Sequence, residues 1–215
     1  MLCINPNTTW SDSMALAAPL PIERRRRSVR GEPRERPDRK EWVRRAMVTL
    51  ADRGVEAVRV EVLAKELNVT KGSFYSRFHD RNDLLSSVLL EWRRSTVTSI
   101  AEQIVGRSGS GREKLQKLWR ICLSGRFDNP GGTIEAALEQ WGRRDPAVAQ
   151  LLAATDLERI GFITSLYREA GVDEPDVMGR AFYQTVLGRN LSLLRGAGAD
   201  SEHDAALMRL LQIDG

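Results

Sequence analysis

From Asp38 onward, apolar residues recur every three or four positions, which is the spacing of one face of an α-helix. Asp38 is a good N-cap residue, and Gly54 can end the helix that begins there. Trp42, Ala46 and Leu50 fall on the inner face of this first helix. Because no stretch alternates apolar and polar residues for long enough to predict a β-strand, the chain is expected to be all-α, with about nine helices.

The later helices are predicted from the same periodicity together with their start and stop residues. They are expected at residues 59–67, 70–78, 80–105, 112–125, 132–141, 146–170, 175–195 and 202–213. Two of them open with proline at the first helical position, after Asp145 and after Glu174. The glycine-rich run from Gly106 to Gly111 is predicted to be a loop.

The N-terminal segment, residues 1–36, is predicted to be a disordered, arginine-rich extension. It holds the run "ERRRRSVRGEPRER" and lacks the apolar periodicity that builds a core. Residues 1–83 contain 17 Lys and Arg against 12 Asp and Glu, whereas the remainder has 16 against 17. This local basic excess suggests either a polyanionic partner or a merely solvated tail, and charge alone does not decide between them.

Composition excludes several classes of protein. The two cysteines, Cys3 and Cys122, form no disulfide framework or metal array, which suits a reducing cytosol. No apolar run approaches the roughly 20 residues that span a membrane, and the N-terminus does not have the pattern of a secretory signal. The protein is expected to be cytoplasmic, without a metal, a cofactor or a membrane partner.

The stretch "VEVLAKELNVTKGSFYSRF" predicts two helices joined by a tight turn. The inner stripe of the first helix is Val60, Leu63, Ala64 and Leu67. Asn68 stands where the turn needs a left-handed backbone, a conformation that asparagine tolerates. Val69 is expected to fill the turn, and the hydroxyl of Thr70 to cap the second helix. Phe74 and Phe78 are expected to anchor that helix to the core.

The second of these helices contains Gly72, although glycine inside a helix costs about 1 kcal/mol relative to alanine. Its outward face is rich in hydrogen-bond donors, namely Lys71, Gly72, Ser73, Tyr75, Ser76 and Arg77. An exposed helix start binds phosphate, and the DNA major groove admits one helix with its leading residues at the base edges. Gly72 is therefore interpreted as a position where the helix backbone lies against DNA.

The segment "VLAKELNVTKGSFYSRFHDRNDLL" resembles the DNA-binding segment of the TetR family of transcriptional repressors. The resemblance extends over about 60 residues, from Pro37 to Val97. It implies an N-terminal helix-turn-helix domain at residues 37–97 and a larger helical effector-binding and dimerisation domain at residues 98–215. It also implies a homodimer whose two reading helices face a palindromic operator in double-stranded DNA.

The resemblance assigns DNA contacts to the positions that match the family's motif: Arg59, Thr70, Lys71, Gly72, Ser73, Tyr75, Ser76, Arg77 and Arg81. The start of the reading helix is implied to reach base edges, and Tyr75 to donate to a phosphate. A packing role for Tyr75 and a solvated surface role for Arg81 stay open. The sequence departs from the family at Glu61, which phosphate would repel, so that Arg59 is the expected contact there, and at the small Ser76.

The C-terminal half contains no catalytic constellation. Its aromatic residues at helical spacing are either core residues or, as the resemblance implies for the middle helices, the lining of an effector pocket. The pocket candidates are Trp119, Cys122, Phe127, Trp141, Phe162 and Tyr167. Cys122 lies on an apolar helix face and is also interpreted as a core thiol.

The helix at residues 175–195 carries one stripe that is expected to form the dimer seam. The stripe consists of Met178, Phe182, Val186, Asn190 and Leu194. Gly179 and Gly188 are expected to allow close approach of the partner helix. Asn190 either pairs with its symmetry mate or faces solvent.

Three functions are consistent with these features. The first is a sequence-specific repressor that a small-molecule effector releases from its operator. The second is a basic architectural DNA-binding protein without an effector. The third is an enzyme, because "INPNTT" at residues 4–9 resembles the opening of aspartate/glutamate/hydantoin racemases. That short match is otherwise a coincidence, or part of an overlong start in which Met14 or a later codon is the true one.

Overall fold

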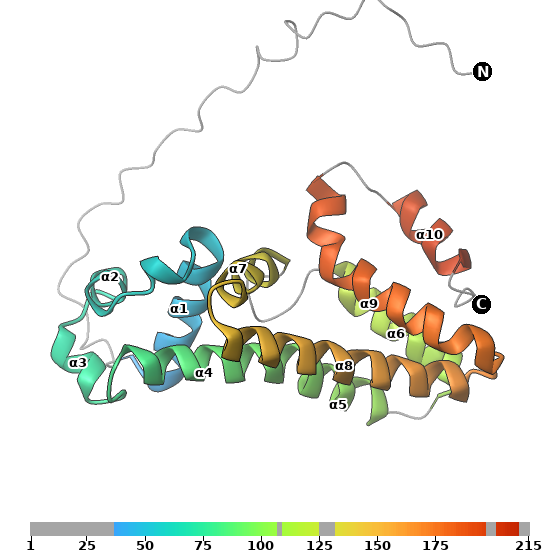
Figure 1. The fold of residues 1–215 in the computed structure, drawn as a ribbon, viewed down its shortest axis with the longest axis horizontal. Coiled ribbons are helices and arrows are strands. Elements are labelled where there is room, and N and C mark those ends of the chain that lie inside the picture. Colours follow the sequence, from blue (N-terminus) through green and yellow to red (C-terminus); the bar gives the residue numbers. More distant parts are fainter. Residues whose placement is uncertain (1–36, 107–108, 125–131, 197–200, 211–215) are drawn as a thin grey trace, which may run out of the picture. The chain divides into compact units, whose positions relative to one another are not determined.

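The computed structural model describes residues 37–106, 109–124, 132–196 and 201–210, without the side chains of residues 123–124, 132–133, 191–196, 201 and 210. These residues form helices and no strand (Figure 1). The α-helices are α1 Arg39–Arg53, α2 Val60–Glu66, α3 Lys71–Tyr75, α4 Arg81–Arg93, α5 Ser99–Val105, α6 Gly111–Ser124, α7 Gly132–Gly142, α8 Pro146–Glu169, α9 Glu174–Gly196 and α10 Ser201–Leu210. A π-turn, Arg94–Thr98, joins α4 to α5 in one helical run, so the described chain has nine helices and the all-α prediction is confirmed.

The ends of the helices lie where the capping residues placed them. The Asp38 carboxylate accepts from the Glu41 backbone N–H at 2.8 Å, and Asp145 accepts from the Ala147 N–H at 3.0 Å. Gly54 ends α1 with φ 77°, a conformation that favours glycine. A short 3₁₀ turn, Val55–Ala57, follows it and was not part of the sequence prediction.

The core of the N-terminal region is built around the aromatic rings of α1 and α3. Phe74 packs edge-on against Trp42 at 5.3 Å and stacks on Phe78 at 5.1 Å, measured between ring centroids. This core continues into α7 and the start of α8, through the buried residues Ile134, Leu138, Val148 and Leu152. The helix-turn-helix therefore shares its core with two helices of the C-terminal half, while the boundary at residue 97 stays a prediction.

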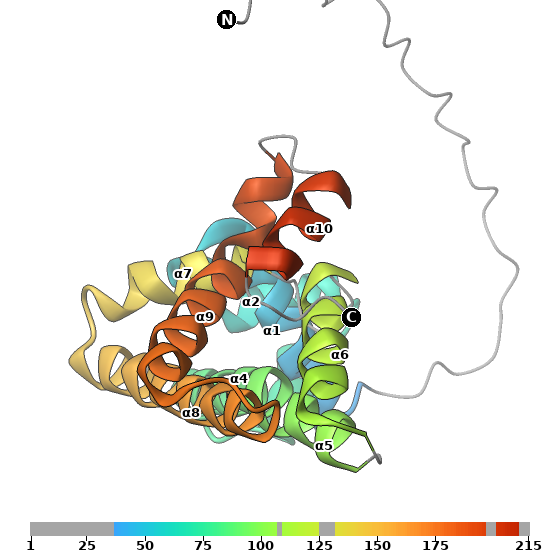
Figure 2. The same ribbon diagram turned by 90° about the vertical axis from the view of Figure 1, so that its right-hand side faces the viewer.

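A second core lies between α5, α6, α8 and α9. Its fully buried side chains include Ile104, Leu115, Trp119, Tyr167 and Ala181. Figures 1 and 2 show α8 running beside the α4–α5 run, where Arg93 pairs with Glu158 at 2.5 Å. The two cores lie at opposite ends of this pair of long helices.

The π-turn interrupts what the sequence predicted as one regular helix over residues 80–105. Within it, the hydroxyls of Ser95 and Thr96 donate to the Trp92 carbonyl at 2.9 and 2.8 Å. Such side chain-to-backbone bonds compete with the regular helical pattern, which is a local reason for the wider turn.

Gly111, the first residue of α6, is required by close packing against the end of α8. A Cβ atom at this position would lie 2.3 Å from the Ala170 backbone nitrogen and 2.5 Å from the Glu169 carbonyl carbon. Gly111→Ala is therefore expected to lower the free energy of unfolding by about 1–3 kcal/mol in urea titrations, the usual cost of overpacking. Gly72→Ala is the matched control, because the nearest atom to its Cβ would be 3.6 Å away. Equal unfolding midpoints for the two variants would contradict the close α6–α8 contact.

Candidate DNA interface and effector pocket

The turn between α2 and α3 has the backbone that the sequence predicted. Asn68 has φ 57°, the left-handed conformation expected of it. The Val69 N–H donates to the Ala64 carbonyl at 2.9 Å, and the Val69 side chain packs against the N-terminal core. Phe74 and Phe78 are buried, as predicted. These contacts fix α3 on α2 and α1.

Thr70 occupies the N-cap position of α3, but its hydroxyl makes no capping hydrogen bond. The prediction that this hydroxyl caps the helix is therefore wrong. Only its backbone carbonyl closes the first turn, by accepting from the Ser73 N–H at 3.0 Å. The hydroxyl oxygen instead lies 3.6 Å from the position that a Cβ of Gly72 would occupy.

Gly72 is exposed, and nothing in the fold requires it to be glycine. Its φ is not in the left-handed region, and apart from the chain neighbours and the helix's own backbone the Thr70 hydroxyl is the sole described atom within 4 Å of an added Cβ. The 3.6 Å separation is an ordinary van der Waals contact. The packing of the described residues therefore does not explain the absence of a side chain at Gly72.

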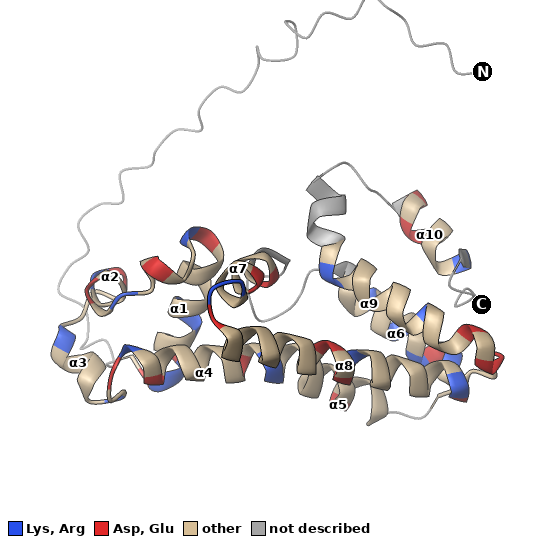
Figure 3. Ribbon diagram, in the orientation of Figure 1, with Lys and Arg blue, Asp and Glu red and all other residues tan. Residues whose placement is uncertain are grey.

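The other predicted contact residues of α3 lie at its surface. Tyr75 is 60% exposed, and its ring packs edge-on against Phe74 at 5.2 Å. Lys71, Ser76 and Arg77 are exposed, and Ser73 is half-buried. Figure 3 shows a basic position at the start of α3 and further basic positions in the turn toward α4. Because the Ser76 hydroxyl donates to the Ser73 carbonyl at 2.8 Å, it is already engaged in ending the helix.

Lys71 and Glu61 form an ion pair of 2.9 Å between α3 and α2. The hydrogen bond from Lys71 lowers the pKa of Glu61, and the same bond raises the pKa of Lys71. Arg59, exposed at the start of α2, adds a favourable charge beside Glu61. The carboxylate that departs from the family pattern is thus partly neutralised by the lysine that is expected to contact DNA.

Arg81 is bound within the domain. Its Nε donates to the Val58 carbonyl and its Nη2 to the Val55 carbonyl, both at 2.6 Å. These bonds hold the 3₁₀ turn against the start of α4, a role that sequence reasoning did not find. The contact between Arg81 and phosphate stays a prediction.

Arg39 also has a structural role that the sequence did not predict. It donates to the Arg77 carbonyl and to Asp83, and its guanidinium lies over the Phe78 ring at 4.1 Å from the centroid. It joins the first turn of α1 to the end of α3 and the start of α4, so it supports the position of the reading helix.

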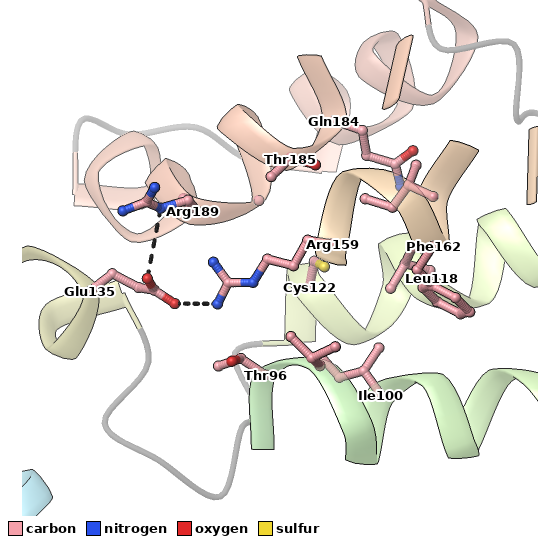
Figure 4. Close-up of a pocket in the computed structure, with 13 residues that line it drawn as sticks. Thr96, Ile100, Leu118, Cys122, Glu135, Arg159, Phe162, Gln184, Thr185 and Arg189 are labelled. Carbon is pink, nitrogen blue, oxygen red and sulfur yellow. Dashed lines mark hydrogen bonds and ion pairs between the residues drawn. The ribbon is translucent and has the colours of Figure 1, made fainter. Parts of the chain in front are cut away.

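A pocket lies between the π-turn and the helices α5, α6, α7, α8 and α9 (Figure 4). Its cavity volume is about 100 Å³, and the pocket is open to solvent at its mouth. It is lined by Thr96, Val97, Ile100, Leu118, Cys122, Glu135, Arg159, Phe162, Ile163, Gln184, Thr185, Gly188 and Arg189. An apolar wall with a few polar groups is typical of small-molecule sites.

The predicted pocket residues fall in different places. Cys122 and Phe162 line this pocket. Trp119 and Tyr167 do not, because both are fully buried in the core behind it, and Trp141 packs against the N-terminal core. Phe127 lies outside the described residues.

Two of the pocket candidates have strongly raised pKa values. Burial raises the pKa of the Cys122 thiol to about 11, which fits the interpretation as an unreactive thiol. Burial likewise raises the pKa of Tyr167 to about 12. Both groups are therefore neutral at physiological pH, so neither contributes a charge to the site.

Charged residues close one end of the pocket. Arg159 donates to Glu135 at 2.7 Å, and Glu135 also accepts from the Trp92 indole N–H at 3.2 Å. Asp156 accepts from both Arg159 and Arg189. Sequence reasoning missed this network because its members lie on three helices, and each alone has the pattern of a solvated charge.

The predicted dimer seam is an exposed apolar stripe on α9. Met178, Phe182 and Val186 are 57%, 58% and 42% exposed. Asn190 is exposed, with its amide donating to the Val186 carbonyl at 2.8 Å. The side chain of Leu194 lies outside the described residues.

Three further residues bear on the predicted seam. Leu157 on α8 is also exposed and was not part of the predicted seam. Gly188 lines the pocket, where its Cβ would lie 3.9 Å from the Cys122 sulfur, and so does not serve the seam as expected. Gly179 has open space around its Cβ position.

The features behind the alternative functions find no counterpart in the described residues. The racemase-like residues 4–9 and the arginine-rich segment lie outside them, and the described chain contains no strand of an α/β enzyme. Within the described ranges no group of three or more His, Cys, Asp or Glu side chains is arranged to hold a metal ion. None of the described helices is both long and apolar enough to cross a membrane.

Comparison with known proteins connects this geometry to a family. Residues 43–88 match the sequence profile of the bacterial regulatory proteins of the tetR family. No curated protein matches the chain in sequence. Solved structures resemble the fold at low sequence identity.

Escherichia coli NemR in its reduced form has a TM-score of 0.67 at 16% identity, over 82% of this chain and 97% of that one. A Rhodococcus sp. protein assigned to the TetR-family transcriptional regulators has a TM-score of 0.62 at 21% identity, over 81% and 97%. A Saccharomonospora viridis protein assigned as a transcriptional regulator, in complex with choline, has a TM-score of 0.64 at 17% identity, over 81% and 93%. Residues 43–88 thus match the DNA-binding segment of the tetR family of bacterial regulatory proteins, and the described residues have the fold of these solved regulators.

Proposed function

We propose that this protein is a sequence-specific DNA-binding regulator that acts as a two-fold dimer and is released from its operator by a small molecule. The observation that carries the proposal is Gly72, which is exposed at the start of α3 and has no packing reason to be glycine. A helix that lies in the major groove brings its backbone close to the DNA. Lys71, Ser73 and Tyr75 then supply donors on either side of that contact.

The dimer is supported by the exposed face of α9 together with Leu157 of α8. Large exposed apolar side chains that recur along a helix favour burial against a second copy. A two-fold axis through this face would relate two copies of α3, one for each half of a palindromic operator. The half-sites of such operators lie one helical turn of DNA apart, about 34–36 Å, or at a larger spacing.

The proposed release rests on the contacts that join the pocket to the N-terminal core. Glu135 lines the pocket, while its neighbour Ile134 is buried in the N-terminal core. Glu135 also accepts from Trp92, a buried residue of α4 in that same core. A ligand that changes how α7 and α8 pack around the pocket would move α7, and through the bond from Trp92 to Glu135 also α4, relative to α1, and so move the reading helix. The ligand needs different affinities for the two arrangements in order to shift their populations.

The proposal is tested by selecting duplexes from a random pool with the full chain and measuring the affinity of variants for the enriched sequence and for a scrambled one. Lys71→Ala is expected to weaken the selected duplex by roughly ten- to hundredfold and to relax preference at one base position. Tyr75→Phe removes one phosphate contact and is expected to weaken both duplexes by a similar factor. Failure to enrich any sequence, or equal losses of both variants on both duplexes, would refute sequence reading by α3.

A further inference from the structure

Gln184 is a polar side chain on the inner face of α9, and only 2% of its surface is exposed. It lines the pocket on the same side as Leu118 and Phe162 in this view, away from Glu135 and Arg189 (Figure 4). Neither its amide nitrogen nor its amide oxygen has a hydrogen-bond partner in the part of the chain that the structure describes. Because a buried, unpaired amide is destabilising, both atoms are groups that a bound molecule can satisfy.

The charged groups at the other end of the pocket neutralise one another. Arg159 is bonded to Glu135 and to Asp156, and Arg189 is bonded to the second oxygen of Asp156. These largely buried groups are two carboxylates and two guanidiniums, so they carry no net charge together. Glu139, which also contacts Arg189, is half exposed and solvated. Glu135 Oε2 and Arg189 Nε lie 3.7 Å apart and have no hydrogen-bond partner among the described residues, but each faces the opposite charge. Because the four groups are neutral together, an ionised ligand would bury an uncompensated charge, which is costly.

Much of the remaining wall is apolar. It consists of Val97, Ile100, Leu118, Phe162 and Ile163, together with the thiol of Cys122. That thiol is buried and protonated at neutral pH, so it adds neither a charge nor a nucleophile. The Thr185 hydroxyl is already engaged, because it donates to the Ala181 carbonyl at 2.8 Å.

We infer that the pocket takes an uncharged, largely apolar small molecule whose hydrogen-bond donor and acceptor lie side by side, as in a carboxamide or a lactam. The carbonyl of the molecule accepts from the Gln184 amide N–H, and its N–H donates to the Gln184 carbonyl. Its apolar body lies against Leu118 and Phe162. This inference rests on the proposed function, because it names the chemical class of the effector.

The test uses four probes that share one naphthalene ring: 1-naphthamide, 1-naphthoate, 1-naphthylmethylammonium and naphthalene itself. Binding to the full chain is measured by titration calorimetry and by the shift in thermal midpoint. The carboxamide is expected to bind about tenfold tighter than each of the other three. Two of the others carry a charge, and naphthalene lacks the paired hydrogen-bond donor and acceptor. Tightest binding of the anion or the cation, or binding of naphthalene as tight as that of the carboxamide, would overturn the inference.

The role of Gln184 itself is tested with Gln184→Met, which keeps the length and helix preference of the side chain but removes the amide. The variant is expected to bind naphthamide and naphthalene equally, and to have a thermal midpoint at or above that of the unaltered chain. Gln140→Met, the same change at an exposed position of α7, is the control and is expected to keep the preference for the carboxamide. If the Gln184→Met variant still preferred naphthamide over naphthalene, groups other than Gln184 would recognise the carboxamide, and the inferred role of Gln184 would be wrong.

The two proposals fail in different ways. The ranking of the four probes on the unaltered chain decides the ligand class whether or not Gln184→Met folds. If the chain binds a selected duplex but does not prefer naphthamide, the inference about the ligand is wrong while DNA binding stands. If it prefers naphthamide but selects no duplex, the pocket assignment holds and the proposed regulatory function is wrong.

Discussion

A chain that carries both Phe182→Asp and Val186→Asp is expected to be a monomer that no longer binds its operator. Both side chains are exposed on the α9 stripe, so the free subunit can tolerate the substitutions. In a dimer, each aspartate would be buried without a partner, and the penalty for burying an unpaired charge is several kcal/mol. Because the two-fold axis doubles every substitution, the seam would contain four such charges.

The measurement combines the mass of the protein in solution, by light scattering, with its affinity for the selected duplex. Ala136→Asp combined with Gln140→Asp is the control, because it places the same two charges four residues apart on an exposed part of α7. The control is expected to remain a dimer and to bind DNA. A stable Phe182→Asp, Val186→Asp monomer with unreduced operator affinity would reject this seam, and so would a variant that stays dimeric.

The helix-turn-helix could be predicted from the sequence because its determinants are local. The left-handed backbone at Asn68 and the carboxylate cap at Asp38 depend on a few neighbouring residues. The anchoring of Phe74 follows from its spacing to Phe78. The prediction that the Thr70 hydroxyl caps α3 was wrong, although Thr70 does occupy the N-cap position. Whether the hydroxyl caps the helix depends on the direction in which it points, and its place in the sequence does not fix that direction.

The pocket could be predicted only in part, because its wall is assembled from segments that are distant in sequence. Aromatic residues at helical spacing, such as Trp119 and Tyr167, are more often core residues, and here the structure places both in the core. Gln184 has no distinguishing neighbour in the sequence, and its burial depends on how α9 packs against α6 and α8. The bonds from Arg81 to two backbone carbonyls could not be predicted for a similar reason, because one of these carbonyls lies in a 3₁₀ turn and the other directly after it, and the periodicity did not predict this turn.

Gly72→Leu is expected to abolish specific DNA binding without disturbing the fold. The Cβ position is open apart from the Thr70 hydroxyl at 3.6 Å, so the free protein has room for a larger side chain. Leucine also has a higher helix propensity than glycine. In the complex, however, the added side chain would stand between the start of α3 and the floor of the groove, and would push the whole helix outward. Gly72→Ala adds one methyl group and is expected to give an intermediate loss.

The central claim, that the backbone of α3 lies against DNA at Gly72, is tested most directly by the affinity of Gly72→Leu for the selected duplex. The measurement is made beside the unaltered chain at one salt concentration, because protein–DNA affinities depend steeply on salt. Circular dichroism and the thermal midpoint establish that the variant is folded. The account predicts a loss of affinity on the order of a hundredfold or more with an unchanged thermal midpoint. A folded Gly72→Leu chain that binds the selected duplex as tightly as the unaltered chain would contradict it.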